Sequence, residues 1–274
     1  MTMNGSNAAP EKPTSGSGST GAAFDLLKLL DELLRRRETF FEEIFNGQRV
    51  SVRIRWFLVA IVVLSGFYGG TMGAMSFTAD FQTGVLQSLT SAVKVPALFL
   101  LSVAICLPVL YVVLVLMGAR LSFAQALALI FLALALNSVL LASCAPIVVF
   151  FTVTGSDYHF IKLLHVAVFA FSGFWAMKAL WQGLSAMCEK SDLYPKRAVS
   201  ILKVWILVFG FVGTQMAWSL RPFVGSPGLG YALFRTGREG NFYAAVWVSA
   251  RSLARGDAPV PRGDAAPQPG PGDK

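Results

Sequence analysis

Charge is scarce in this sequence. Only 14% of its 274 residues are charged, whereas an average soluble domain has about 25%. The 23 basic and 15 acidic residues are also unevenly placed, with 12 in the 163 residues from Trp56 to Trp218 and 26 in the other 111. This deficit excludes an ordinary soluble enzyme and predicts a polytopic membrane protein with an apolar middle and polar ends.

Cysteine and histidine are also few. The three cysteines, Cys106, Cys144 and Cys188, have neither the even number of a disulfide framework nor the paired spacing of a zinc site. The two histidines, His159 and His165, lack the converging ligands of a metal site and the intramembrane acids of a proton relay. We therefore expect no bound metal and no cofactor.

Catalytic signatures are missing from the sequence. There is no GlyXSerXGly elbow, no phosphate-binding loop that ends in GlyLysSer or GlyLysThr, no HisGluXXHis and no GlyXGlyXXGly after a strand. No Asp or Glu lies inside any expected span, so no carboxylate is available there for acid–base chemistry. We expect no catalytic residues and no enzymatic activity.

The long apolar runs that are present predict an all-α fold with five transmembrane helices. A bilayer core about 30 Å thick is crossed by about 20 helical residues. The expected bundle covers residues 52–220, with spans at about 56–79, 95–119, 121–145, 161–185 and 202–220. Pro146 is expected to break or kink the third span and to leave residues 146–156 as a re-entrant or interfacial piece.

Polar segments flank the expected bundle. Residues 1–22 and 256–274 have low-complexity compositions that predict disordered tails. Residues 221–255 predict a Pro/Gly-rich extramembrane segment with a short aromatic stretch at 241–247.

An amphipathic helix is expected on the cytoplasmic side at residues 23–46. Its leucine and phenylalanine side chains fall on one arc at about 100° per residue, among them Leu27, Leu30, Leu34 and Phe41. Six acidic and four basic residues at positions 24–45 make electrostatic attachment to anionic lipid weak. The apolar face therefore either packs on the protein's own membrane domain or on lipid, or binds a partner or a second copy.

Small residues recur at helical spacing in the first expected span. Gly66, Gly70 and Ala74 lie on one stripe, and Gly69 and Gly73 lie on an adjacent one. Small residues at this spacing let two membrane helices approach until their backbones touch. The pattern predicts an interface, which is either internal packing against another span or the seam of a homodimer.

Polar side chains inside the later spans include Asn137, Gln182 and Gln215. In membrane proteins such groups usually form hydrogen bonds between helices, worth about 0.6 kcal/mol each on average. The other interpretation is that they line a polar path for a solute or an ion.

Lysine and arginine counts predict the orientation. With the N-terminus inside, the cytoplasmic flanks and short loops hold 14 basic residues, while Lys94 and Lys162 are the only two in the short outer loops. This favours a multi-pass protein of the inner (plasma) membrane with a cytoplasmic N-terminus. The net charge of +8 is then mostly flanking charge, so the expected partners are the lipid bilayer and other membrane proteins or a second copy, and not nucleic acid.

The sequence ArgLeuSerPheAlaGlnAlaLeuAlaLeu at 120–129 and AlaPro at 145–146 resemble bacterial members of the Yip1-type membrane family, which also place a polar region before their spans. The likeness extends in outline over residues 50–220. The chain departs from the family's AspLeuTyrGlyPro signature, because AspLeuTyrPro stands at 192–195 between the last two spans. The resemblance implies a non-enzymatic scaffold or trafficking role and assigns no functional residue.

Two functions follow as expectations. The first is an integral membrane scaffold or assembly protein that binds partners or itself through the amphipathic helix and the glycine-striped first span. The alternative is a subunit of a small-solute or ion transporter or channel, with a polar path through the third to fifth spans.

Overall fold

All regular elements in the described part of the computed structural model are helices, as the all-α expectation requires. The structure describes residues 28, 31–33, 35, 37–78, 81–116, 118, 121–155, 157–190, 196–224, 233 and 242–255. In chain order the helices are α2 (Arg37–Phe45), α3 (Val50–Gly73), the short 3₁₀ helix η1 (Ala74–Thr78), α4 (Phe81–Leu116), α5 (Phe123–Val153), α6 (Tyr158–Lys190), α7 (Lys196–Ser219) and α8 (Phe242–Arg255).

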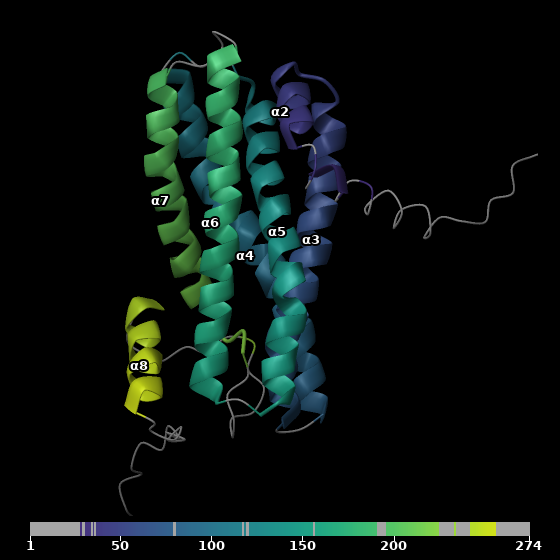
Figure 1. Cartoon of the computed structure of the whole chain (residues 1–274), viewed down its shortest axis with the longest axis vertical. Helices are drawn as coiled ribbons and strands as arrows, with labels where there is room; N and C mark the ends of the chain where they lie inside the picture. The colour runs from purple at the N-terminus through teal and green to yellow at the C-terminus, as the bar shows by residue number, and fades with distance from the viewer. Residues whose placement is uncertain are drawn as a thin grey trace, which may run out of the picture.

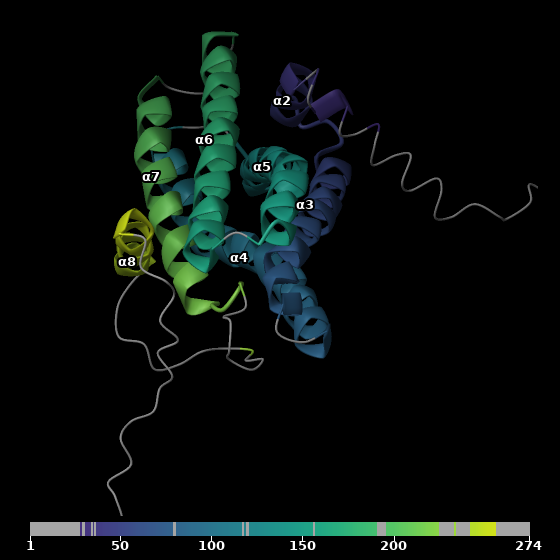
Figure 2. The same cartoon turned by 60° about the horizontal axis from the view of Figure 1, so that its bottom comes forward.

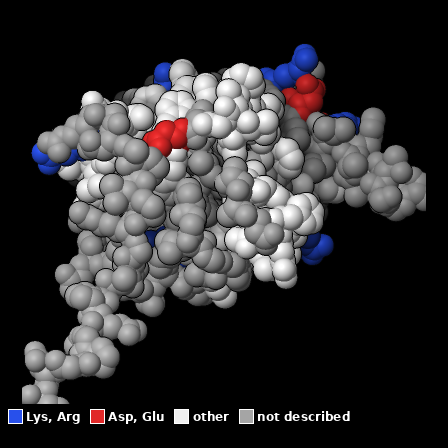
Figure 3. Space-filling view, turned by 90° about the horizontal axis from the view of Figure 1, so that it is seen from below, with Lys and Arg blue, Asp and Glu red and all other residues white. Residues whose placement is uncertain are grey.

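The helices α3 to α7 run side by side in alternating directions and form one elongated bundle (Figure 1). We call the end that carries α2 the upper end and the opposite end the lower end. Helix α3 packs on α4 and α5, α5 packs on α6, and α7 packs on α4. Seen from below, the described surface of the lower end is mostly uncharged (Figure 3).

Five helices in the described part are long and apolar enough to cross a bilayer, which confirms the expected number of spans. They are Val50–Gly73, Phe81–Leu116, Phe123–Val153, Tyr158–Gln182 and Leu202–Ser219. Helix α4 begins at Phe81, earlier than the expected start at 95. At about 1.5 Å per residue its 36 residues are longer than the bilayer core, and α4 crosses the bundle at a marked tilt (Figure 2).

The expected break at Pro146 is wrong. Helix α5 continues through Pro146 to Val153 as one α-helix, so residues 146–153 form no separate re-entrant piece. A proline removes one backbone donor, and packing against neighbouring helices lets a membrane helix tolerate that loss. Beyond the proline Val148 is fully buried, and the Thr152 hydroxyl donates to the Val148 carbonyl at 2.9 Å.

Tryptophan and basic side chains pair towards both ends of α7. The Lys203 ammonium lies 4.5 Å from the centroid of the Trp181 ring, and the Arg221 guanidinium lies 3.8 Å from that of Trp218. Lys203 and Trp218 are 15 residues apart in the sequence, which is ~22 Å of helix. Because such pairs favour the membrane–water interface, the two pairs mark the ends of the membrane-spanning part of α7, over a distance somewhat shorter than the bilayer core of about 30 Å.

The aromatic stretch expected at 241–247 contributes to α8, which packs on α6 and α7. The Tyr243 hydroxyl lies 3.1 Å from the Thr214 hydroxyl of α7, and the Tyr243 ring stacks on Phe211. Part of the segment expected outside the membrane therefore lies against the membrane-spanning helices. The expected tails at 1–22 and 256–274 lie outside the described residues.

Candidate functional site

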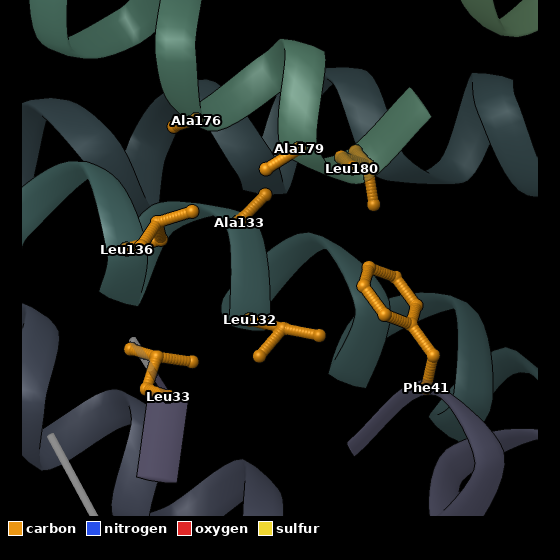
Figure 4. Close-up of a pocket in the computed structure, with 8 residues that line it drawn as sticks. All are labelled: Leu33, Phe41, Leu132, Ala133, Leu136, Ala176, Ala179 and Leu180. Carbon is orange, nitrogen blue, oxygen red and sulfur yellow. The ribbon is translucent and has the colours of Figure 1, made fainter. Parts of the chain in front are cut away.

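The apolar face of the N-terminal amphipathic segment lies against the protein's own membrane domain. Leu33 and Phe41 are buried, and Figure 4 shows both side chains pointing towards α5 and α6. Together they line a small apolar cavity whose other walls are Leu132, Ala133, Leu136, Ala176, Ala179 and Leu180. Phe41 is thus engaged internally. The other residues expected on this face, Leu27, Leu30 and Leu34, lie outside the described residues.

An ion pair fixes α2 to α3. Arg53 donates from Nε and Nη2 to Oε2 of Glu43, at 2.8 Å and 2.7 Å. The Arg53 guanidinium also lies 4.5 Å from the centroid of the Phe40 ring. Both charged side chains are partly buried, so this pair is better shielded from water than a surface salt bridge.

A glutamine at the start of α5 holds the end of α2. Gln125 Nε2 donates to the carbonyl oxygens of Ile44 and Phe45, at 2.9 Å and 3.0 Å, at the end of the helix where carbonyls lack the regular helical bond. Its Oε1 accepts from the Ser122 backbone N–H at 2.8 Å in a capping box. The glutamine in the 120–129 motif thus joins two helices.

One of the two small-residue stripes on α3 forms the close crossing with α4. A Cβ added at Gly69 would lie 2.4 Å from the Ser91 carbonyl oxygen, and one added at Gly73 would lie 2.4 Å from the Ser88 Cα and N atoms. Both glycines are buried. This stripe is an internal helix–helix contact.

The second stripe is more open. Gly66, Gly70 and Ala74 help to line a shallow groove on the outer surface of α3 and α4, where Phe67 and Phe77 are exposed. A Cβ at Gly70 would meet nothing closer than the Ala92 Cβ at 4.0 Å, which is ordinary contact. At the other end of this stripe a Cβ on Gly66 would lie 3.1 Å from the Ala92 carbonyl oxygen, so α4 covers Gly66 closely and the open part of the stripe is around Gly70.

The three intramembrane polar residues share no hydrogen bond. Asn137 is buried in α5, and its Oδ1 has no hydrogen-bond partner in the described part of the chain. Gln182 is exposed on α6. Gln215 is half-buried on α7, where its carbonyl accepts from the Ser219 hydroxyl.

A buried polar pair that the sequence did not single out joins α3 to α6. The Tyr68 hydroxyl lies 2.9 Å from His165 Nδ1, and the two residues are 0% and 3% exposed. The Phe169 ring packs edge-on against Tyr68. His165 Nε2 is buried and has no hydrogen-bond partner among the described residues. The two residues are 97 positions apart, so no local pattern could reveal the pair.

The expectation that Lys94 lies in a short outer loop is wrong. It lies well inside α4 and is only 5% exposed. Polar residues of α4 interrupt the apolar run before Lys94, and for that reason the sequence placed the start of the span after it. Lys162 likewise belongs to α6 and not to a loop. Lys94 donates to the Leu233 carbonyl and to the segment that follows α7.

We call that segment, Arg221 to Val224, the strap. Gln87, Ser91 and Lys94 share one face of α4, and all three are at least nine-tenths buried. Ser91 Oγ donates to the Phe223 carbonyl at 2.6 Å, and Lys94 Nζ donates to the Pro222 carbonyl at 3.2 Å. Gln87 Nε2 lies within hydrogen-bond distance of both carbonyls, at 3.1 Å and 3.2 Å. The strap is thus bound through its backbone.

Comparisons with known proteins give no relative. No family model, no curated protein and no solved structure matches the chain. The likeness to the Yip1-type family therefore rests on the sequence motifs alone. Within the described residues, no group of three or more His, Cys, Asp or Glu side chains is placed to hold a metal ion. The five spans identify the chain as a multi-pass membrane protein that associates with a lipid bilayer.

Proposed function

We propose that this protein is a membrane-embedded scaffold or assembly protein, without catalysis of its own, that associates with a second copy through its first span. The observation that carries the proposal is the open groove beside α3. Its floor contains Gly66, Gly70 and Ala74, and the exposed rings of Phe67 and Phe77 stand next to it.

Small-residue stripes promote close packing of membrane helices, and α3 has two of them. The chain fills one with α4 and leaves the other open around Gly70, where the groove faces outward. The residues that line the groove are all uncharged, which suits an apolar membrane helix as the occupant.

The same surface offers both a groove and a ridge. Phe67, which is 61% exposed, and Val63, which is 50% exposed, project beside the small residues. A twofold dimer requires one patch to be complementary to itself. A ridge next to a groove on one helix meets that requirement, which favours a second copy over an unrelated partner.

The amphipathic segment has a different part in this proposal. Because Phe41 and Leu33 are buried against α5 and α6, we assign them to stabilising the upper end of the bundle and not to partner binding.

We further propose that the upper end faces the cytoplasm of a bacterial inner (plasma) membrane. The 14 basic residues of the flanks and loops assigned to that side support this orientation. A scaffold role is also what the resemblance to the Yip1-type family implies. Labelling of single cysteines from either side of sealed vesicles tests the orientation, and an N-terminus labelled only from outside would contradict it.

Gentle extraction followed by intact-complex mass spectrometry tests the self-association. We expect a dimer for the unaltered protein and a monomer for Gly70→Leu, which fills the groove from a position that has open space around its Cβ. Val109→Leu, at a position on α4 that is 62% exposed and away from the groove, should remain dimeric. A monomeric unaltered protein, or a Gly70→Leu variant that stays dimeric, would contradict the proposal.

A transporter or channel subunit is the second candidate. The observation that favours it is the set of polar side chains buried in the lower half of the bundle, namely Tyr68, Gln87, Lys94 and His165. Flux of ions or small solutes into liposomes that contain the purified protein would support this function. The absence of flux for every cation, anion and neutral solute in a test panel would exclude this function.

A further inference from the structure

We propose that Gln87, Ser91 and Lys94 form an intramembrane binding site for backbone carbonyl groups, and that its occupant is the chain's own strap. The bound strap acts as a latch that closes the lower end of the bundle and shields the Tyr68–His165 pair from water. This inference concerns the interior of one chain and does not depend on self-association.

The site is built from side chains that need polar partners. An amide, a hydroxyl and an ammonium group, each at least nine-tenths buried, lie on one face of α4. Such groups are costly in an apolar surrounding unless they are hydrogen-bonded. The strap meets this need, because the carbonyls of Pro222 and Phe223 accept from all three.

The strap is positioned by these contacts. It lies outside the regular helices, and in both views it leaves α7 and turns inward between the lower ends of α6 and α5 (Figures 1 and 2). Val224 is buried in the apolar core, and the Phe223 ring lies 5.9 Å from Lys94 Nζ. Removal of the α4 donors should therefore release the strap.

Lys94 also makes release of the strap feasible. Its long apolar stem allows the ammonium to reach towards water when its partners leave. An open state would then hydrate the charge instead of leaving it in hydrocarbon. The site can therefore bind the strap tightly in the closed state, while the open state stays accessible because the ammonium is hydrated there. A latch requires both properties.

Tyr68 lies next to the residue of α3 that touches the latch site on α4. Gly69, the neighbour of Tyr68 in α3, abuts the Ser91 backbone at the helix crossing, and Ser91 itself binds the strap. His165 is seven residues from the first residue of α6, Tyr158, which is ~10 Å from the lower end of that helix. With the strap in place the His165 side chain is almost completely buried.

Carbethoxylation of histidine by diethyl pyrocarbonate, quantified by peptide mass spectrometry in a mild detergent, tests this inference. The chain has only two histidines, and half-buried His159 in the first turn of α6 serves as an internal reference. We expect His165 to be protected in the unaltered protein. Lys94→Met should raise its modification rate about tenfold or more, a change that corresponds to about 1.4 kcal/mol, and should leave His159 unchanged.

Two further variants complete the test. Ser91→Ala removes the 2.6 Å hydrogen bond to the Phe223 carbonyl without adding bulk to α4, so it should also expose His165, and it decides the matter if Lys94→Met does not fold. Lys178→Met is the matched control, because Lys178 lies over Trp175, away from the strap. Equal modification of both histidines in the unaltered protein would overturn the latch. So would protection of His165 in folded Ser91→Ala.

Discussion

The crossing of α3 and α4 allows a quantitative prediction from three alanine substitutions in one helix. At Gly69 and Gly73 an added Cβ would lie 2.4 Å from backbone atoms of α4, whereas ordinary contacts begin at 3.4 Å. The two helices must therefore separate by roughly 1 Å, because backbone atoms cannot rotate out of the way as a side chain can. Overpacking of this kind typically costs about 1–3 kcal/mol.

The third substitution, Gly70→Ala, is the matched control. Its Cβ would meet only the Ala92 Cβ at 4.0 Å, so no separation is needed. Every glycine-to-alanine change in a helix gains intrinsic helix propensity, about 1 kcal/mol in water. That gain is common to all three variants and cancels in the comparison. We expect Gly69→Ala and Gly73→Ala to be less stable than Gly70→Ala by about 1–3 kcal/mol.

Thermal unfolding in one mild detergent, followed by tryptophan fluorescence, measures the difference. Gel filtration at the same dilution should show the same oligomeric state for all three variants, so that self-association does not contribute. Equal unfolding midpoints for Gly70→Ala and Gly73→Ala would refute the reasoning, because they would mean that α3 and α4 are not in backbone contact.

Three other predictions rest on single contacts. Arg53→Gln leaves Glu43 partly buried without its ion pair, so faster hydrogen exchange in α2 is expected; unchanged exchange would show that apolar packing alone holds α2. Trp205→Phe removes a 3.0 Å hydrogen bond from Nε1 to a carbonyl of α4, so it should lower the free energy of unfolding by about 1 kcal/mol. The same thermal unfolding measures this change, and an unchanged stability would contradict the contact. Tyr68→Phe and His165→Leu should not be additive, because each removes the same hydrogen bond; a double-mutant cycle that gives no coupling energy would contradict their pairing.

The sequence predicted the elements whose evidence is local. Long apolar runs located five spans, and the 3.6-residue period of leucine and phenylalanine located a helical segment before them. The same criterion failed at the start of α4, where Gln87 and Lys94 interrupt the run although both are buried. It failed at Pro146 as well, because tertiary packing decides whether a proline ends a membrane helix.

The candidate sites could be predicted only in part. The glycine stripes are visible in the sequence, but which stripe faces α4 depends on how α3 is rotated in the bundle. The contacts of the strap join residues more than 120 positions apart, and one of them is a lysine that a hydropathy window assigns to a loop. Every residue has a backbone carbonyl, so no sequence motif can reveal a site that binds carbonyl groups.

The two ends of the bundle are closed by opposite chemistry, and this difference follows from their surroundings. At the upper end α2 lies beside the start of α3, which carries Arg49, Arg53 and Arg55, so water is near and apolar side chains such as Leu33 and Phe41 gain by burial. At the lower end the strap turns in among membrane-spanning helices. Apolar burial gives little specificity among helices in lipid, whereas an unsatisfied polar group there is costly. Hydrogen-bond donors such as Lys94 are therefore the effective means of holding the strap in one position.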